Sequence, residues 1–364
     1  MTRIRVPLGK FIKEYSERNK GNEDIPVYSV TNSQGFCTEY FGKEVASQDK
    51  TTYKIVPQGY FAYNPSRINV GSVDWQRYEK RVIVSPLYNV FSVSEGIDRQ
   101  YLYYFLRSDL GRQMIKAKAS GSVRDNLKLD MLKEMTIPDI SVEQQKFCSS
   151  VLDKLHKLIQ MRQQELQKLD EFIKARFVEM FGNPRINPNK YPTKLIKDTC
   201  IVITGNTPSR KVHEYYGDAI EWIKTDNIVS SLLYPTVASE SLSDSGKAVG
   251  RAVDAGAILM ACIAGSVASI GRVCITDREV AFNQQINAIV PKEYDVRFLH
   301  ALLQISKDYL VEDINMSLKG IISKSKLEEK EFIVPSMEEQ VGFADFVKQI
   351  DKSKFENHNF ISGY

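Results

Sequence analysis

Cysteine and histidine are scarce in this sequence, and neither follows a pattern that binds metal or forms a disulfide framework. The 364 residues include five cysteines, and none of them forms a CxxC pair. Their odd number also argues against complete pairing; they are Cys37, Cys148, Cys200, Cys262 and Cys274. The four histidines, His156, His213, His300 and His358, have no metal-ligand spacing. We therefore expect reduced thiols, no zinc ribbon and no bound metal.

Long apolar runs and a strong charge excess are also missing. No apolar stretch approaches the roughly 20 residues that span a bilayer, and the first residues, MTRIRVPLGKFIK, lack a signal-peptide core. We therefore expect a cytoplasmic protein without a membrane partner. The formal net charge of +4 is only mildly basic. It permits an anionic partner but does not identify one.

The sequence contains no complete motif for catalysis or nucleotide binding. The string NPSR at 64–67 lacks the second proline and the aromatic residue with which adenine methyltransferases hold a flipped base. No GxxxxGK[ST] loop is present. Gly265, Ser266 and Ser269 do not complete a GxSxG motif. We predict a binding protein that is not an enzyme and that has no cofactor of its own.

The most informative feature that is present is an internal repeat. KEMTIPDISVEQQKF at 133–147 is similar to KEFIVPSMEEQVGF at 330–343. Three pairs are 197 residues apart and a fourth is 195 apart: Pro138 and Pro335, Gly59 and Gly256, Tyr101 and Phe298, and Asn32 and Asn227. Solenoid repeats have periods of only about 20–50 residues. The longer offset indicates a duplicated domain, and hence two similar sites for one extended ligand.

Both copies have the residue pattern of a small domain that mixes helices and strands. Short apolar runs bounded by turn residues, such as KIVPQGYFAYNP and GAILMACIA, predict strands. Helical stretches follow at 98–118 and 295–312. We predict an α/β (α+β) protein with two similar globular domains, at 1–140 and 184–335, each built on small twisted mixed sheets.

Residues 141–183, between these domains, are predicted to form a long helix. The segment from Ser141 to Phe181 has neither proline nor glycine, and Ser141 is suited to an N-cap. Apolar residues recur at heptad spacing with polar interruptions, at Leu152, Leu155, Ile159, Leu166, Leu169, Ile173 and Met180. At about 1.5 Å per residue, the rod would be about 60 Å long. The pattern favours a coiled coil; a surface helix packed on a neighbouring domain is the alternative.

A second helix is expected at 336–364. It begins near Ser336 and carries the apolar residues Phe343, Phe346, Val347 and Ile350. We expect it to stop in the tail SKFENHNFISGY and to be much shorter than the first helix.

The order domain, long helix, domain, helix resembles the DNA-specificity (S) subunit of type I restriction–modification enzymes. The similarity is carried by ITGNTPSRKVHEYYGDAIEWIKTDNI (203–228), GAILMACIAGSVASIGRV (256–273) and FNQQINAIVP (282–291). The first half matches more loosely, through NPSRINVGSV (64–73). The shortened C-terminal helix departs from the family, in which the second helix is about as long as the first.

This resemblance implies a non-catalytic subunit that binds double-stranded DNA. Two target-recognition domains would each read one half of a split, asymmetric sequence, and the two helices would form an antiparallel coiled coil that spaces them. The implied partners are two methyltransferase (modification) subunits and the restriction, or motor, subunits. Those partners would carry S-adenosylmethionine and ATP.

The candidate DNA contacts are polar and basic loop residues that occur at matched places in the two halves. Arginine can read guanine, asparagine and glutamine can read adenine, and serine, threonine and lysine commonly bind phosphates. In the first half they are Arg67, Asn69, Arg124, Asn126 and Lys128. In the second half they are Thr207, Ser209, Arg210, Lys211, Lys224, Asn227, Ser266, Ser269, Arg272 and Lys319. For each, an ordinary solvated loop residue is the alternative.

Other functions stay open on the sequence alone. Duplicated domains joined by a helical strut also suit a non-enzymatic protein-interaction scaffold. A truncated or phase-variant specificity subunit with altered assembly, or a fragment of a fused restriction–methylation enzyme, would show the same pattern. The DNA target, its gap length and the oligomeric state follow from no simple residue code.

Overall fold

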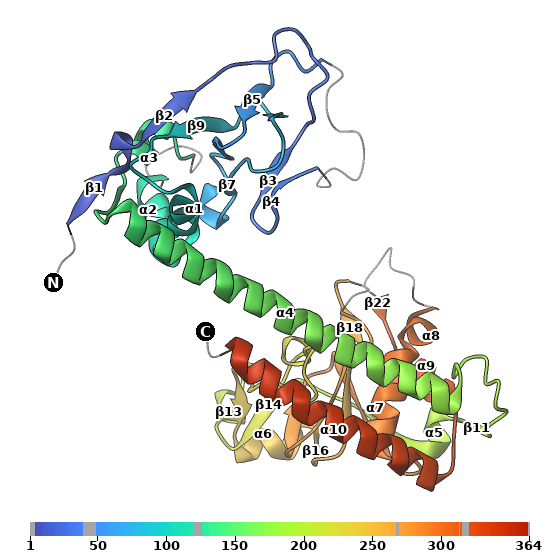
Figure 1. Cartoon of the computed structure of the whole chain (residues 1–364). Helices are drawn as coiled ribbons and strands as arrows, with labels where there is room; N and C mark the ends of the chain where they lie inside the picture. Colours follow the sequence, from blue (N-terminus) through green and yellow to red (C-terminus); the bar gives the residue numbers. More distant parts are fainter. Residues whose placement is uncertain are drawn as a thin grey trace. The chain divides into compact units, whose positions relative to one another are not determined.

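The computed structural model describes residues 4–38, 49–119, 126–266, 269–312, 314 and 320–362. The chain divides into two compact units, Met1–Leu158 and Ile159–Tyr364, whose elements are labelled in Figure 1. Each unit combines helices with several small sheets, and the second contains both parallel and antiparallel strand pairs. The predicted α/β (α+β) class is therefore confirmed.

The first unit is built on an antiparallel sheet of strand order β2-β9-β6-β7. Its strands are β2 (Ile12–Tyr15), β6 (Phe61–Tyr63), β7 (Val73–Trp75) and β9 (Asn89–Val93). Three further pairs are β1 (Arg5–Pro7) with β10 (Thr136–Pro138), β3 (Ser29–Thr31) with β4 (Gly35–Cys37), and β5 (Lys54–Pro57) with β8 (Arg81–Val84). The helices are η1 (Leu8–Lys10), η2 (Ile68–Val70), α1 (Arg99–Arg107), α2 (Asp109–Ala119) and α3 (Leu129–Lys133).

The second unit repeats this plan with the order β12-β21-β17-β19. These strands are β12 (Cys200–Thr204), β17 (Ile258–Ala261), β19 (Val273–Ile275) and β21 (Ile286–Pro291). A second sheet has the order β13 (Tyr216–Gly217), β15 (Ser241–Leu242), β14 (Ile220–Ile223), β20 (Val280–Phe282) and β16 (Ala252–Val253). The remaining strand pairs are β11 (Thr193–Leu195) with β23 (Glu331–Ile333), and β18 (Ile263–Ala264) with β22 (Gly320–Ile321). The helices are α5 (Ile196–Thr199), η3 (His213–Tyr215), η4 (Thr225–Asn227), α6 (Asp244–Val249), α7 (Val296–Ile305), α8 (Lys307–Val311) and α9 (Lys324–Glu328).

The helical stretches predicted at 98–118 and 295–312 are each two helices rather than one. The first breaks at Ser108, which has an extended backbone, and the second breaks at Ser306. The Ser108 hydroxyl accepts a hydrogen bond from Gly111 N at 3.1 Å, which caps the new helix. Because serine bonds readily to nearby backbone groups, it favours helix ends over helix interiors.

Turn glycines mark equivalent positions in the two units. Gly59 and Gly256 have φ values of +83° and +90°, and Gly71 and Gly271 have φ values of +98° and +73°. Glycine adopts these left-handed conformations without the steric cost that a Cβ brings. Both pairs of glycines therefore form left-handed turns.

The central helix α4 spans Val142–Phe181 without interruption. Of the predicted heptad positions, Ile173 is buried, whereas Leu152, Leu155, Ile159, Leu166, Leu169 and Met180 are half-buried. At its C-terminal end, Ile173, Phe177 and Phe181 enter the main core of the second unit. This end of α4 is thus part of the second unit's core.

The last helix, α10 (Met337–Ser362), pairs with the C-terminal part of α4 in antiparallel fashion, and Figure 1 shows them side by side. The ring centroids of Phe172 and Phe346 are 5.2 Å apart, and those of Phe177 and Phe343 are 5.4 Å apart. Because the contact partner in α10 comes earlier as the residue in α4 comes later, the two helices run antiparallel.

The helix continues through most of the tail in which we expected it to stop. It has 26 residues against 40 in α4, so it is shorter, but it extends to Ser362. Asparagine and serine each disfavour a helix interior by only about 0.5 kcal/mol. The tail up to Ser362 contains neither glycine nor proline to end the helix.

Candidate functional site

The first-half candidates lie in two loops that meet. Arg67 is exposed directly before η2, and Asn69 is half-buried within it. Asn126 is half-buried and Lys128 is exposed just before α3. A backbone hydrogen bond joins these two loops, so the structure brings both groups to one place. Arg124 lies outside the described residues, as does Lys319 of the second half.

In the second half, two candidate cations share one carboxylate. Arg210 Nη2 is 2.7 Å from Glu240 Oε2, and Lys224 Nζ is 2.7 Å from Glu240 Oε1. Hydrogen bonds from Lys224 and Arg210 lower the pKa of the Glu240 carboxyl. The Arg210 guanidinium also lies over Tyr216, at 4.5 Å from the ring centroid, and over Trp222, at 5.1 Å. The guanidinium is therefore oriented before any ligand arrives.

The other candidates of this loop are exposed. Thr207, Ser209 and Lys211 lie between β12 and η3, and all three face solvent. The Thr207 hydroxyl donates a hydrogen bond to Gln284 Oε1. They accompany Arg210 on the same loop, and their contacts with DNA stay predictions.

Asn227 has a structural role that the sequence did not reveal. Its side chain is buried, with 9% of its surface exposed. Its Nδ2 donates to Thr236 Oγ1 at 3.0 Å and to Val237 O at 3.1 Å, and its Oδ1 accepts from Lys224 N at 3.0 Å. The amide therefore holds the loop around η4, and the contact of Asn227 with DNA stays a prediction.

Ser266, Ser269 and Arg272 form another local network. Ser266 Oγ donates to Ser269 Oγ at 3.0 Å. Arg272 donates through Nε to Ser269 O and through Nη2 to Thr225 O, each at 3.2 Å. Arg272 thus ties the loop before β19 to η4. Only Ser266 of this group is fully exposed.

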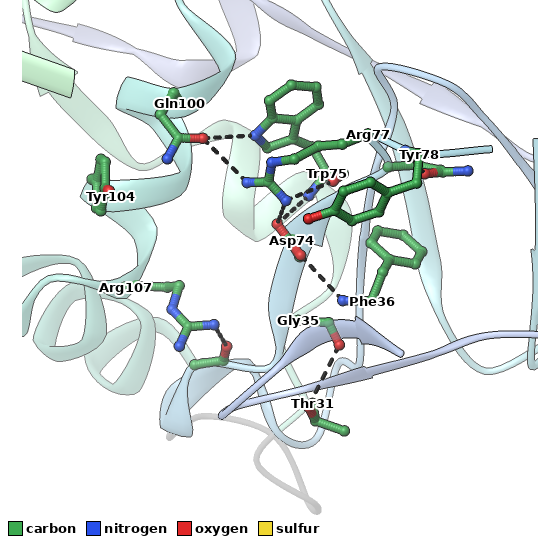
Figure 2. Close-up of polar contacts among 12 residues, drawn as sticks. Thr31, Gly35, Phe36, Asp74, Trp75, Arg77, Tyr78, Gln100, Tyr104 and Arg107 are labelled. Atoms are coloured by element: carbon green, nitrogen blue, oxygen red, sulfur yellow. Dashed lines mark hydrogen bonds and ion pairs between the residues drawn. The ribbon is translucent and has the colours of Figure 1, made fainter. Parts of the chain in front are cut away.

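Sequence reasoning missed a polar cluster of the first unit, shown in Figure 2. Asp74 is almost completely buried, and its Oδ1 accepts a hydrogen bond from Arg77 Nη1 at 2.6 Å. Gln100 Oε1 accepts from Arg77 Nη2 at 3.1 Å and from Trp75 Nε1 at 3.2 Å. Gln100 Nε2 in turn donates to Asp153 of α4 at 2.8 Å. The cluster therefore connects β7, α1 and the start of α4.

Aromatic and guanidinium groups stack beside this cluster. Arg77 lies 4.3 Å from the Trp75 ring centroid and 5.1 Å from that of Tyr103. Arg107 lies 5.1 Å from the Tyr103 ring as well. Burial raises the pKa of Tyr103. Alternating cations and rings are mutually attractive and fix the arginine side chains in place.

The described residues contain no group of three or more histidine, cysteine, aspartate or glutamate side chains placed to hold a metal ion. Burial raises the pKa of Cys200 to about 11 and that of Cys262 and Cys274 to about 12. These thiols are therefore protonated at neutral pH and poorly nucleophilic. No helix in the described part of the chain combines the length and apolar character needed to cross a membrane.

The family comparison accounts for both units. The family described as "Type I restriction modification DNA specificity domain" matches residues 9–171 and 188–362. This chain belongs to that family. One specificity domain thus corresponds to each copy of the repeat, together with a portion of the helix that follows it.

Curated relatives of this specificity-domain family agree over part of the chain. The specificity subunit of the type I restriction enzyme MjaIX from Methanocaldococcus jannaschii is 32% identical over 171 residues, 45% of this chain and 38% of that protein. The HindI specificity subunit from Haemophilus influenzae is 29% identical over 157 residues, 42% of this chain and 33% of that protein. Each match thus spans less than half of the relative's own length.

Solved structures show the same fold over nearly the whole chain. The S subunit of a type I restriction–modification system from M. genitalium superposes with a TM-score of 0.53 at 13% identity, covering 100% of this chain and 93% of that one. A chain from work on complex assembly and conformational transition of the type I R-M system gives a TM-score of 0.59 at 16% identity, covering 99% and 94%. These similarities support the two-domain specificity fold.

Proposed function

We propose that this chain is the DNA-recognising subunit of a type I restriction–modification enzyme. Each unit would read one half of a bipartite, asymmetric DNA target. The chain would direct methyltransferase and restriction subunits to that target. Catalysis, with S-adenosylmethionine and ATP, would belong to those partners, so this chain would be non-catalytic.

The observation that carries the proposal is that both family-matched segments fold in the same strand order and place cations at the same turn. In the first unit, Arg107 Nη1 donates to the carbonyl of Gly71 at 3.1 Å. In the second, a pocket of about 280 Å³ beside Gly271 is lined by Arg272, Lys307 and Lys174. Arginine and lysine side chains are the groups that commonly bind DNA phosphates, which supports two equivalent contacts with one duplex.

The test is a binding measurement on the chain in complex with its methyltransferase partner. Duplexes that carry the sequence methylated by this complex are compared with scrambled duplexes over a series of salt concentrations. We expect preferential binding to the target, with affinity that falls steeply as salt rises because phosphate contacts release counterions. Equal binding to both duplexes, or an affinity that does not change with salt, contradicts the proposal. Partner binding without DNA binding would favour the interaction scaffold instead.

A further inference from the structure

The first unit contains a small hairpin with an exposed tip, and this hairpin has no counterpart among the described strands of the second unit. Strands β3 and β4 pair through Ser29 with Cys37 and through Thr31 with Gly35. The tip between them, residues 32–34 with the sequence Asn-Ser-Gln, is exposed. Thr31 and Gly35 mark the hairpin in Figure 2. A two-stranded ribbon of this kind fits the width of the DNA major groove.

The base of the hairpin is fixed by the buried carboxylate of Asp74. Its Oδ2 accepts a hydrogen bond from Phe36 N at 3.1 Å, and its Oδ1 accepts from Trp75 N at 2.8 Å. Gly35 has a φ of +66°, and a Cβ on it would lie 2.0 Å from Asp74 Oδ2. The hairpin therefore needs glycine at this place, and it sits directly on the cluster that Arg77 completes.

The tip is held from the other side by Arg107. Its Nη2 donates to the carbonyl of Asn32 at 2.5 Å, while its Nη1 donates to the carbonyl of Gly71. Within the tip, Gln34 N donates to Thr31 Oγ1 at 3.0 Å. These bonds use main-chain atoms of the tip. The backbone is thus pre-organised, which reduces the entropy lost on binding.

Asn32 and Gln34 are both exposed, whereas the residue equivalent to Asn32 in the repeat is buried. Neither amide makes a hydrogen bond to another residue in the described part of the chain. Asn227 occupies the equivalent place in the repeat, but it is buried and makes three hydrogen bonds. The same residue type therefore has a structural role in one copy and faces solvent in the other.

A pocket lies beside the hairpin and adds a cation. It has a volume of about 250 Å³, and Asn32, Arg67, Asn64 and Tyr28 are among its lining residues. Its described lining contains no carboxylate. A polyanion approaching this face meets a positive charge and no lining carboxylate that would repel it.

We propose that the tip of the β3–β4 hairpin is a base-reading element of the first unit and that Asn32 and Gln34 recognise adenine in the major groove. A carboxamide can bind adenine bidentately, because its nitrogen donates to adenine N7 while its oxygen accepts from the N6 amino group. Arg67 would contact a neighbouring phosphate. The inference rests on the proposed function, because it names the residues that read one half-site.

The test uses the full chain bound to its methyltransferase and a duplex library randomised in one half-site at a time. The variants are Asn32→Ala, Gln34→Ala and the double variant. We expect preference for adenine at one or two adjacent positions of one half-site to fall about tenfold or more, as for loss of a bidentate base contact. Preference in the other half-site should stay unchanged. Gln113→Ala, which removes an exposed amide of α2 in the same unit, is the matched control.

Each alternative outcome has a definite meaning. A uniform loss of affinity for all sequences would identify phosphate contacts and overturn base reading by these amides. Unchanged selection in all three variants, with unchanged thermal unfolding, would overturn the inference while leaving the proposed function intact. If the unmodified complex selected no sequence in either half-site, the proposed function itself would fail.

A gain-of-function variant gives an independent readout. Arginine prefers guanine, through O6 and N7. Gln34→Arg should therefore shift the preferred base at the affected position from adenine to guanine. A shift in the other half-site, or a variant that binds all sequences more tightly without a new preference, would contradict the assignment of Gln34.

Discussion

Gln145 and Gln340 make the same three hydrogen bonds at the starts of α4 and α10. Gln145 Oε1 accepts from Asp98 N at 2.8 Å, and Gln340 Oε1 accepts from Asp295 N at 2.9 Å. The Nε2 of Gln145 donates to Ile140 O and Gly96 O, and that of Gln340 to Pro335 O and Glu293 O. Each glutamine thereby ties a long helix to the N-cap of α1 or α7, and so orients the helix against its domain.

Replacing Gln340 with leucine should destabilise the second unit. The side chain is 1% exposed, so the variant leaves a buried N–H and two carbonyls without their partner. We expect a loss of about 1–3 kcal/mol in the free energy of unfolding, the usual cost of unsatisfied buried groups. Urea unfolding measures it. Gln164→Leu, on the exposed surface of α4, is the control, and an equal effect in both variants would refute the role of the buried amide.

Two glycine substitutions should have opposite effects on stability. Gly35→Ala introduces a Cβ 2.0 Å from Asp74 Oδ2 at a φ of +66°, so we expect a loss of more than about 1 kcal/mol. Gly342→Ala, in α10, meets nothing within 4 Å. It should gain up to about 1 kcal/mol because alanine favours the helix. Thermal unfolding of both variants checks the pair, and a stable Gly35→Ala protein would contradict the packing at the hairpin base.

The second unit should lose stability as the pH falls towards 4. Burial, with smaller effects from Lys354 and Arg297, lowers the pKa of His300 from 6.5 to about 4; its bond with the Val273 backbone and the charge of Asp170 act in the opposite direction. Between these values the unfolded chain binds more protons than the folded one, so stability decreases on acidification, by up to about 3 kcal/mol.

His300→Phe should flatten this pH dependence, measured by urea unfolding at pH 7.5 and 5. Because the substitution also changes packing, the quantity compared is the change in the free energy of unfolding between the two pH values. His156→Phe, at an exposed position of α4, is the control. A slope that survives in His300→Phe would assign the acid sensitivity to another group.

Shortening α4 should change the spacing of the DNA target. Deleting residues 157–163 removes seven residues, about 10 Å of helix, and nearly preserves the face on which later residues lie because seven residues make about two turns. We expect the gap between half-sites to shorten by about 3 base pairs, since base pairs are about 3.4 Å apart. Methylome sequencing of cells that express the variant with its partner subunit measures both the gap length and the half-site sequences. Altered half-sites with an unchanged gap would show that α4 does not set the spacing.

The repeat was predictable because its landmarks are backbone requirements. Gly59 and Gly256 occupy left-handed turns that few other residues tolerate. Pro138 is the last residue of strand β10, and Pro335 lies two residues after strand β23. The same geometry imposes the same residues in both copies. Because each of these constraints acts on one residue and its neighbours, the repeat can be recognised from a single sequence.

The polar cluster around Asp74 was not predictable in this way. Its bond to Phe36 joins residues 38 positions apart, and Gln100 meets Asp153 across 53 positions. No local pattern encodes such contacts. Asn32 and Asn227 show the same limit, because their equivalent positions in the repeat gave no indication that one is exposed and the other buried. Burial is decided by tertiary packing, which composition does not specify.

The first and last strands of each unit along the chain pair with each other: β1 pairs with β10, and β11 pairs with β23. The chain therefore enters and leaves each unit at neighbouring points. Exchange of a whole unit would therefore need only two junctions close together, and the glutamine anchor at the following helix would stay in place. Under the proposed function, such an exchange would replace the reader of one half-site and leave the reader of the other half-site unchanged.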